Sequence, residues 1–519
     1  MDKGYGNWVT IHAVREPDRV ALVDGVGGRE TTWRELEERT NRLCDALRAN
    51  GVRKGDRVAL FAMNSAAMME VYFAVGKLGA ITVPVNFRLQ PAEVAYVLND
   101  SGATFLFVSA DLLEVAQQAL ADSPSVRRTV VIPMLADRAN GDEGQYGELL
   151  ASGSAERLVR DVDDRDVAVI MYTSGTTGLP KGAMLTHRNF FYNAINACGM
   201  GSGIGRDDVT ISAAPLFHIG ALSIHTMPLA FIGGCTVALE AFTAGDWLDA
   251  VERHRPTQVF LVPAMWSAVV QDPTIGSRDL GSLTFAMSGG APCPITIINA
   301  MQGYGVAFTE GFGMTETAPL ACYLAPEDVL THAGSIGRPF NLVELQVVGE
   351  DGRQMPTGEV GELAIRGENV FVGYWDKPTE TAQALRGGWL FSGDLAYVDA
   401  EGYYTLVDRK KDMIITGGEN VYPVEVEQVM YQHPAVGEVA VIGLPDEKWG
   451  EAVVAVVAVK PGAELDVEQL REWTRERIAH YKAPKEIRLI DELPRNATGK
   501  ILKRELRQSQ GGTATSVTR

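Results

Sequence analysis

The stretch Tyr172-Thr173-Ser174-Gly175-Thr176-Thr177-Gly178-Leu179-Pro180-Lys181-Gly182 decides the fold of this chain. It follows the apolar run Val167-Ala168-Val169-Ile170-Met171, which predicts a buried strand. In a glycine-rich turn, backbone N–H groups can converge on an anion because no Cβ blocks the approach, and hydroxyls and an ammonium group add further donors. The spacing is not that of a P-loop, Gly-x4-Gly-Lys-Ser/Thr. We therefore expect a polyphosphate-binding loop of another kind rather than a solvated surface loop.

Composition and charge limit the classes of protein that come into question. The chain has 519 residues, of which 46% are hydrophobic and 22% charged, as in globular proteins with more than one domain. The net charge of −19 argues against general binding of nucleic acid or anionic membranes. No apolar signal segment and no run of transmembrane length are present, so we expect a cytoplasmic protein without an integral membrane segment. Five unclustered cysteines fit a reducing compartment and have no metal-ligand spacing: Cys44, Cys198, Cys235, Cys293 and Cys322.

Strands alternate with helices in the first part of the chain. Thr32-Trp33-Arg34-Glu35 predicts a capping box at the start of a helix that ends near Gly51. The apolar patterns predict further strands at 20–23, 57–62, 81–83, 104–108, 259–262 and 283–287, and helices at 66–77, after Pro91 and at 186–198. This alternation predicts parallel sheets covered by helices on both faces.

The second part of the chain has a different pattern. Residues 343–407 predict a small β-rich subdomain, and an α+β segment follows Asp408, with strands at 413–415 and near Val439 and Val453 and helices at 424–430 and 467–478. We expect residues 141–166 to be rich in loops and the tail 509–519 to be disordered. The fold class is therefore α/β: a large N-terminal domain of doubly wound sheets with a β-rich subdomain, followed by a small α+β C-terminal domain.

Six motifs occur in the order known from one enzyme superfamily. The chain carries Thr173 to Gly182, Phe217-His218, Gly311-Phe312-Gly313-Met314-Thr315-Glu316, Ser392-Gly393-Asp394, Asp408-Arg409-Lys410-Lys411-Asp412 and Pro494-Arg495-Asn496-Ala497-Thr498-Gly499-Lys500. Together they resemble the adenylate-forming superfamily, which includes acyl-CoA synthetases, peptide-synthetase adenylation domains and beetle luciferases. The resemblance spans nearly the whole chain.

The resemblance implies a reaction in two halves. A carboxylate and ATP give an acyl-adenylate and pyrophosphate, and a thiol then displaces AMP; the co-substrates are ATP and CoA, and the metal is Mg²⁺. It also implies an N-terminal AMP-binding domain at 1–408 and a mobile C-terminal domain at 409–519, with a hinge near Lys411. We expect no nucleic-acid partner. The oligomeric state cannot be read from the sequence.

The resemblance also assigns roles to individual residues. Lys500 bridges the acid carboxylate and the α-phosphate, Glu316 and Thr173 are placed at Mg²⁺, Thr315 contacts phosphate, and His218 contacts the carboxylate or gates the thiol tunnel. Asp394 and Arg409 hold the nucleotide, Lys411 is the hinge, Gly417 and Gly418 line the pantetheine tunnel, and Trp449 and Tyr481 meet the CoA nucleotide or serve ordinary packing. Phe312 and Ser392 stand where many relatives have Tyr and Thr. The remaining nucleotide-binding residues by resemblance are Thr173, Ser174, Gly175, Thr176, Thr177, Gly178, Lys181, Gly290, Ala291, Pro292, Glu310, Gly311, Phe312, Gly313, Met314 and Thr315.

These assignments favour an ATP- and Mg²⁺-dependent acid–CoA ligase. An acyl-AMP ligase that loads a carrier protein, a luciferase-like oxygenase, a peptide-synthetase adenylation module and a non-catalytic nucleotide-binding protein are the alternatives. The residues that by resemblance line the acid pocket contain no arginine, which argues against a dicarboxylate: Phe217, His225, Met227, Met265, Trp266 and Met314. Flexible methionines suit an aliphatic chain, whereas Phe and Trp equally suit a ring. We expect a medium- or long-chain fatty acid, with an aryl acid as the alternative.

Overall fold

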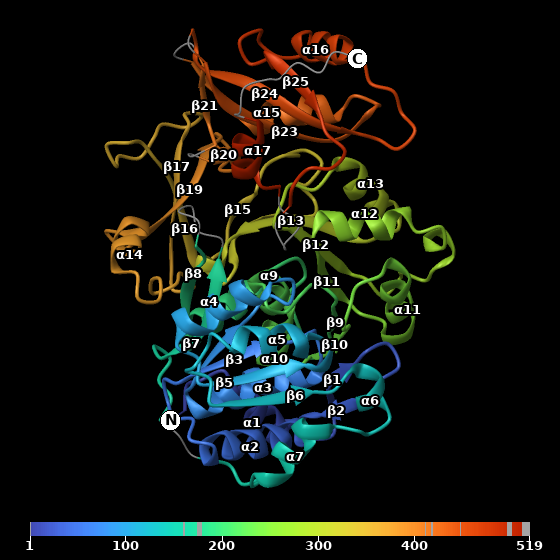
Figure 1. The fold of residues 1–519 in the computed structure, drawn as a ribbon. Coiled ribbons are helices and arrows are strands. Elements are labelled where there is room, and N and C mark those ends of the chain that lie inside the picture. Colours follow the sequence, from blue (N-terminus) through green and yellow to red (C-terminus); the bar gives the residue numbers. More distant parts are fainter. Residues whose placement is uncertain are drawn as a thin grey trace. The chain divides into compact units, whose positions relative to one another are not determined.

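The computed structural model describes residues 2–158, 161–173, 179–409, 412–416, 419–446, 448–495 and 501–510, with only the backbone of Arg409. The chain divides into two compact units, one formed by residues 1–345 and 365–391 and the other by 346–364 and 392–519 (Figure 1). None of the described helices is both long enough and apolar enough to cross a membrane. The α/β architecture confirms the predicted fold class. The expected domain boundary at 408/409 stays a prediction.

The first unit contains three sheets that are parallel in the middle and antiparallel at an edge. Their strand orders are β2-β1-β10-β9, β6-β5-β3-β4-β7-β8 and β11-β12-β13-β14-β15. The strands are β1 Val20–Asp24, β2 Glu30–Thr32, β3 Arg57–Phe61, β4 Ile81–Pro84, β5 Phe105–Ser109, β6 Arg128–Ile132, β7 Val167–Thr173, β8 Lys181–Thr186, β9 Val209–Ser212, β10 Cys235–Ala238, β11 Gln258–Leu261, β12 Phe285–Gly289, β13 Ala307–Gly313, β14 Leu320–Leu324 and β15 Arg338–Pro339.

Helices pack against these sheets. Helix α3 (Ala66–Leu78) is buried along its whole length, because it is apolar on nearly every side. The other helices of this unit are α1 Gly6–Arg15, α2 Trp33–Ala49, α4 Pro91–Ser101, α5 Leu113–Leu120, α6 Leu135–Ala139, α7 Gly144–Ser152, α8 His187–Cys198, α9 Ile219–Ala221, α10 Met227–Ile232, α11 Ala244–His254, α12 Pro263–Gln271, α13 Ile295–Gly303 and α14 Pro378–Ala384. Short 3₁₀ turns lie at Ala110–Leu112, Ile275–Ser277 and Thr315–Thr317, and a π-helical turn lies at Leu222–Thr226.

A further sheet has the order β16-β17-β19-β18, with β20 paired to β19. Its strands are β16 Val343–Val348, β17 Gly361–Gly367, β18 Leu385–Arg386, β19 Trp389–Val398 and β20 Tyr404–Arg409. This is the β-rich region that the sequence predicts between residues 343 and 407.

The second unit carries a sheet of its own, in the order β22-β21-β24-β23 with β25 parallel to β24. Its long hairpin of β23 and β24 has apolar residues on both faces, one packed with Val426, Met430 and Leu470 and the other with Leu493 and Leu506. The elements are β21 Ile414–Thr416, β22 Glu419–Val421, α15 Pro423–Tyr431, β23 Val436–Asp446, β24 Gly450–Val459, α16 Val467–Arg475, β25 Glu486–Leu489 and α17 Lys503–Gln510.

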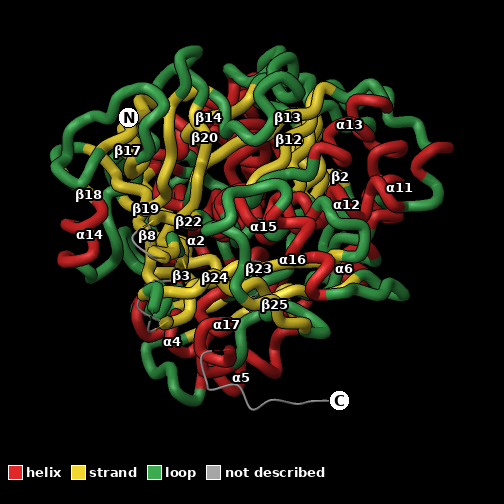
Figure 2. Tube along the Cα trace, turned by 90° about the horizontal axis from the view of Figure 1, so that it is seen from above, coloured by secondary structure: helices red, strands yellow, loops and turns green. Residues whose placement is uncertain are grey.

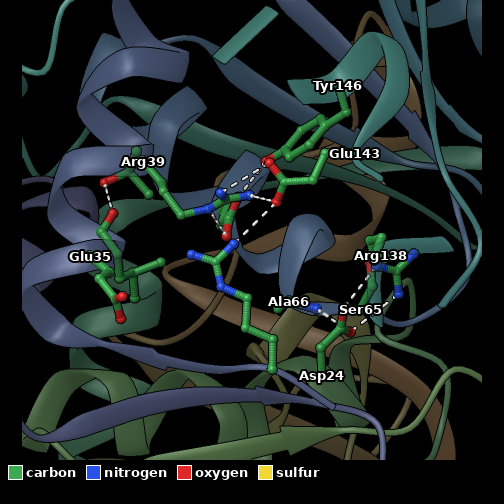
Figure 3. A network of polar contacts seen from close by, with 12 residues as sticks. Asp24, Glu35, Arg39, Ser65, Ala66, Arg138, Glu143 and Tyr146 are labelled. Carbon is green, nitrogen blue, oxygen red and sulfur yellow. Dashed lines mark hydrogen bonds and ion pairs between the residues drawn. The ribbon is translucent and has the colours of Figure 1, made fainter. Parts of the chain in front are cut away.

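A small cavity of about 20 Å³ in the first unit is surrounded by paired charges (Figure 3). Arg39 on α2 donates to Glu70 at 2.7 Å and to Glu143 at 2.8 Å, and the hydroxyl of Tyr146 donates to the other oxygen of Glu70 at 2.6 Å. On the other side of the cavity Arg138 donates to Asp24 at 2.7 Å. We call this group the Arg39 network.

The predicted elements up to 108 and the helix at 186–198 are confirmed, including the reciprocal capping box of Thr32 and Glu35. Two expectations are wrong. Residues 144–152 form helix α7, which buries Tyr146, Leu149 and Leu150, so the segment 141–166 contains more regular structure than its polar composition predicts. Residues 509 and 510 belong to α17, and the rest of the predicted tail lies outside the described residues.

Candidate functional site

Strands β7 and β8 form the antiparallel hairpin that carries the predicted phosphate loop. Thr173 is paired with Lys181 in its register, and the Thr173 hydroxyl lies 3.4 Å from the carbonyl oxygen of Lys181. The predicted loop residues between them, Ser174, Gly175, Thr176, Thr177 and Gly178, lie outside the described residues. The buried strand expected before this loop is confirmed, since Ala168 to Met171 are buried.

The segment Phe371–Trp375 lies between β8 and the turn that holds Glu316. Backbone hydrogen bonds join it to Gly182 and Met184 on one side and to the carbonyl of Glu316 on the other. Tyr374 in this segment donates its hydroxyl to Oε1 of Glu316 at 2.7 Å, and the ammonium of Lys181 lies 5.5 Å from the centre of its ring. Burial and the charge of Glu316 raise the pKa of Tyr374, so it remains a donor. The structure thus brings Lys181 and Glu316, which are far apart in the sequence, to one tyrosine, Lys181 to its ring and Glu316 to its hydroxyl.

The turn Thr315–Thr317 holds Glu316 buried and Thr315 half-buried. Asn369 fixes the end of this turn, because its amide group donates to the carbonyls of Thr317 and Leu320 at 2.7 Å each. Before the turn, Gly313 has no room for a side chain, since a Cβ there would lie 1.5 Å from the carbonyl oxygen of Pro319. The backbone can therefore follow this path only with glycine at 313.

Strands β12 and β13 form the predicted nucleotide wall. They pair in parallel, with Gly289 opposite Gly311, and lie side by side in Figures 1 and 2. A Cβ at Gly311 would lie 1.7 Å from Cε of Met287, so this glycine leaves room for the end of the Met287 side chain. Gly290, Ala291 and Pro292 follow β12 as an exposed edge, and Phe312 and Met314 are half-buried. Small residues at the carboxyl end of a parallel strand suit the approach of a flat ring.

Glu310 on β13 holds the loop that follows β12. Its Oε1 accepts a hydrogen bond from the backbone N–H of Cys293 at 2.7 Å. Burial raises the pKa of Glu310 to about 7, although this hydrogen bond lowers it. The side chain is therefore bound to the loop that carries Gly290 to Pro292, and it acts on the nucleotide wall by positioning it.

His218 lies in a buried aromatic corner. Its ring is 4.2 Å from that of Phe217, which makes an edge contact of 5.0 Å with Phe87. Burial lowers the pKa of His218 to about 4, and the nearby charge of Arg88 lowers it further. Its Nε2 has no hydrogen-bond partner among the residues that the structure describes. A neutral imidazole with a free nitrogen can bind a substrate carboxylate without adding a buried charge.

The predicted acid-pocket residues separate into two groups. Phe217, His225 and Met227 are buried on or beside the helical segment that follows His218, and Met265 and Met314 are half-buried. Trp266 packs in the core instead: its ring contacts Trp247 and Phe308, and its Nε1 donates to the carbonyl of Met287 at 3.3 Å. We therefore leave Trp266 out of the pocket.

In the second unit, Asp394 lies buried on β19. Ser392, two residues earlier in the same strand, has a hydroxyl that donates to the carbonyl of Leu363 at 2.8 Å and accepts from the N–H of Asp394 at 3.1 Å. Gly393 between them has a φ of +75°, which a residue with a side chain rarely adopts. Asp394 pairs with Arg409 in the register of β19 and β20. These contacts fix the backbone at Asp394, the residue that is predicted to bind the ribose.

The aromatic residues predicted for CoA are both surface residues of the second unit. The ring of Trp449 has Lys448 and Lys485 each 4.7 Å from its centre, and Tyr481 lies 5.8 Å from the ammonium of Lys482. Such exposed aromatic and cationic groups can stack on a base and bind phosphate. The predicted residues Lys411, Gly417, Gly418 and Lys500 lie outside the described residues.

The donor set fits Mg²⁺ that is shared with phosphate. Among the described residues, no group of three or more His, Cys, Asp or Glu side chains could hold a metal by itself. Mg²⁺ does not need one, because it is commonly bound by one or two carboxylates together with substrate phosphates and water. Glu316 offers such a carboxylate, and the Thr173 hydroxyl lies at the edge of the phosphate loop.

Three residues of this site were not predicted from the sequence: Tyr374, Phe87 and Arg88. Phe87 and Arg88 follow β4 directly, so the rule that ligands bind at the carboxyl ends of parallel strands could have indicated them. Tyr374 has no such signal, because its segment is irregular and joins the site only through tertiary hydrogen bonds.

Comparisons with known proteins identify relatives over nearly the whole chain. The AMP-binding enzyme family matches residues 9–375, and the AMP-binding enzyme C-terminal domain matches residues 425–500. A feruloyl-CoA synthase from Amycolatopsis sp. is 42% identical over 510 residues, which cover 98% of this chain and 100% of the relative. An indoleacetate–CoA ligase from Aromatoleum aromaticum is 37% identical (96% and 97% covered), and a long-chain-fatty-acid–CoA ligase from Mycobacterium tuberculosis is 35% identical (98% and 99% covered).

Solved structures are similar over the same length. The anthranilate CoA ligase AuaEII in complex with anthranoyl-AMP has a TM-score of 0.88 and 30% identity, with 98% of this chain and 97% of that chain covered. The o-succinylbenzoate coenzyme A synthetase from Bacillus subtilis in complex with ATP and magnesium ion has a TM-score of 0.85 and 31% identity, with 96% and 99% covered.

Proposed function

The chain belongs to the AMP-binding enzyme family, and from this premise we propose that it activates an aryl carboxylic acid with ATP and transfers the acyl group to CoA. Its relatives make it an acid–thiol ligase of the AMP-forming kind. The observation that supports adenylation is the Lys181–Tyr374–Glu316 arrangement, which places a cation and a carboxylate beside the phosphate loop.

In the first half-reaction, a carboxylate oxygen of the acid attacks the α-phosphorus of ATP, and the bond to pyrophosphate breaks. The reaction brings an anion to a polyanion, so fixed cations must stabilise the charge that develops. Lys181 supplies one such cation, and by resemblance Lys500 supplies another at the carboxylate itself. Mg²⁺ at Glu316 would add further positive charge between the phosphates. His218 offers its free nitrogen for the acid carboxylate.

In the second half-reaction, the sulfur of CoA attacks the acyl carbon, and AMP leaves. By resemblance, Asp394 holds the ribose during both steps, and its backbone hydrogen bond to Ser392 supports this assignment. The exposed patch of Trp449, Lys448 and Lys485 suits the nucleotide end of CoA, because it joins an aromatic face to two cations.

Aromatic side chains around His218 support an aryl acid. Phe87 and Phe217 meet edge to face, and Phe260 on β11 lies against the Cα atoms of Gly220 and Gly289. Rings prefer such offset and edge-to-face partners. Two of the relatives are named for the aromatic acids ferulate and indoleacetate. A medium- or long-chain fatty acid, which the sequence favours, is the second candidate because another relative is a long-chain-fatty-acid–CoA ligase.

The experiment is a panel of aryl propenoic, aryl acetic, benzoic and saturated fatty acids. Pyrophosphate release and CoA-thioester formation are measured for each, with Lys500→Ala as the matched inactive control. We expect kcat/KM for the best aryl acid to exceed that for the best fatty acid by at least about 10-fold, the selectivity that a shaped pocket commonly provides. A preference for fatty acids would overturn the aryl assignment. Pyrophosphate release without consumption of CoA would indicate a carrier protein as the thiol.

A further inference from the structure

His225 is a buried imidazole without a partner. It is 2% exposed, and both of its ring nitrogens lack a hydrogen-bond partner among the residues that the structure describes. A buried polar group left unsatisfied costs about 1–3 kcal/mol, so native proteins seldom keep one without a use. Burial also lowers the pKa of His225 to about 3, so the ring is neutral and offers one N–H donor and one nitrogen acceptor.

The ring lines a small cavity. The cavity has a volume of about 10 Å³, which is room for one oxygen atom of a water or a hydroxyl group. Its walls come from β9, the π-helical turn and β11: Thr210, Ile211, Ser212, Ala214, Ala221, His225, Thr226 and Phe260. The π-helical turn Leu222–Thr226 contains His225, and such irregular turns are common at functional sites.

Two hydroxyl groups of the cavity wall already donate hydrogen bonds to other protein groups. Thr226 donates to the carbonyl of Ala221 at 2.9 Å, so in the 2.6 Å contact between Thr226 and Ser212 it is Ser212 that donates. These two oxygens can only accept a further hydrogen bond. A guest in the cavity is therefore favoured if it donates, as a hydroxyl group does, and an ether oxygen or a carboxylate is disfavoured.

Phe260 connects this cavity with the nucleotide wall. Its ring lines the cavity, and the same ring lies 3.3 Å from the position that a Cβ of Gly289 would occupy and 3.2 Å from that of Gly220. Gly289 is the last residue of β12, directly before the wall residues Gly290 to Pro292, and Gly220 follows His218 by two residues. A planar acid whose carboxylate lies at His218 would thus point its far end past Phe260 toward His225.

We propose that His225 determines acid specificity by accepting a hydrogen bond from a hydroxyl group at the far end of the substrate, so that the preferred acid is a hydroxylated aryl acid. The proposal rests on the aryl acid–CoA ligase function proposed above and identifies the substituent that the site recognises, a hydroxyl group. A site built to hydrogen-bond a substrate hydroxyl rejects the analogue without it, because its own buried group is then left unpaired. A bound water is the other possible guest of the cavity, and the experiment distinguishes the two.

The experiment compares matched acids on matched variants. The acids are 3-phenylpropenoic acid and its ring-hydroxylated and ring-methoxylated forms, and kcat/KM is measured by pyrophosphate release and by thioester formation. For the native enzyme we expect one hydroxylated acid to exceed the unsubstituted acid by about 10- to 100-fold, the ratio that 1.4–2.8 kcal/mol provides. His225→Leu should reduce this ratio to near 1 by losing activity on the hydroxylated acid while retaining activity on the unsubstituted one.

Two further variants separate specificity from folding. His225→Gln keeps a hydrogen-bond acceptor and should keep part of the preference, and Ile224→Val, a change at the adjacent buried residue, should leave the ratio unaltered. Thermal unfolding of each variant shows that it is folded. The proposal is overturned if His225→Leu loses activity equally on all acids, as a structural role or a bound water would predict, or if native enzyme shows no preference for a hydroxyl. In the latter case turnover of aryl acids would still support the proposed function, whereas the lack of any aryl turnover would overturn both.

Discussion

Two small cavities of the first unit differ in whether the polar groups that line them have hydrogen-bond partners. Around the cavity of the Arg39 network, each charge that we traced has an opposite charge or a hydroxyl within hydrogen-bond distance (Figure 3). Around the other cavity, the imidazole of His225 has no partner among the described residues. The two cavities differ little in size, at about 20 and 10 Å³. Completeness of hydrogen bonding, and not volume, therefore separates a structural cavity from a candidate binding site.

Two carboxylates of this unit also differ in their surroundings. Glu70 accepts from Arg39 on one oxygen and from Tyr146 on the other, so it is part of the Arg39 network. Glu316 accepts from the hydroxyl of Tyr374, and the ring of Tyr374 lies beside the ammonium of Lys181 at the hairpin of the predicted phosphate loop. Mutations in the first group should therefore change stability, and mutations in the second should change catalysis.

The largest effect is expected for Arg39→Met, which breaks the Arg39 network. It leaves the carboxylate of Glu70 buried without its cation, and the loss of one partner of a buried pair costs about 3–5 kcal/mol. Denaturant unfolding measures the loss, and KM for the acid should stay unchanged in the folded fraction. The double variant Arg39→Met with Glu70→Gln should lose less than the sum of the single losses. A catalytic defect without a stability defect would contradict the structural assignment of this cavity.

Unlike Arg39→Met, Glu316→Gln should change catalysis rather than stability. It keeps the acceptor for Tyr374 but removes the charge, so pyrophosphate release should fall by about 10²–10³-fold, or about 2.7–4 kcal/mol, and the Mg²⁺ requirement should rise. A Mg²⁺ titration at saturating ATP measures both. Tyr374→Phe, which removes only the hydrogen bond, is the matched control and should cost less. An unchanged Mg²⁺ titration would remove Glu316 from the metal ligands.

Glu310 should make stability depend on pH. Burial holds its native pKa near 7, whereas the unfolded carboxyl titrates near 4.5, so the native state binds more protons between these values. Stability from this residue is therefore fully present below about pH 4.5 and falls as the pH rises through 7, by up to about 1.4 kcal/mol per pH unit. Glu310→Gln should flatten this dependence in unfolding experiments at a series of pH values. Equal slopes for the two proteins would show that Glu310 is ionised in the native state.

The smallest effect is expected for Thr32→Ala at the start of α2, the helix that carries Arg39. Thr32 accepts a hydrogen bond from the N–H of Glu35, and Glu35 accepts one from the N–H of Thr32 at 2.8 Å. Loss of such a cap costs about 1 kcal/mol, which thermal unfolding can resolve. Thr32→Ser should restore most of it. If the serine variant is as unstable as the alanine variant, packing of the methyl group rather than the cap holds this helix end.

Much of the fold could be predicted because the apolar residues of the sheets and helices recur at clear periods. Helix α7 escaped prediction, since only Tyr146, Leu149 and Leu150 are buried in a segment rich in acidic residues and glycine. The antiparallel edges of the parallel sheets were also not predicted. Strand pairing is set by long-range contacts, which a local pattern does not contain.

The candidate site was predictable where its residues lie at or directly after the carboxyl ends of strands, as at Gly290 after β12 and Gly311 near the end of β13. The role of Tyr374 could not be predicted, because it depends on an irregular segment placed by backbone bonds to Met184 and Glu316. The orphaned ring of His225 is equally invisible in the sequence. A histidine in an apolar run shows its missing partners only when its neighbours in three dimensions are known.

The contact between Cys293 and Glu310 affects whether the enzyme can transfer the acyl group to its own cysteine. The proposed reaction forms an acyl-adenylate, a strong electrophile, next to the loop that contains Cys293. A thiolate there could accept the acyl group in place of CoA, because only the ionised form of a thiol is a good nucleophile. Burial, together with the nearby charge of Glu310, raises the pKa of the Cys293 thiol to about 12. The side chain thus stays protonated and unreactive, and the activated acyl group is reserved for the thiol that arrives from solution.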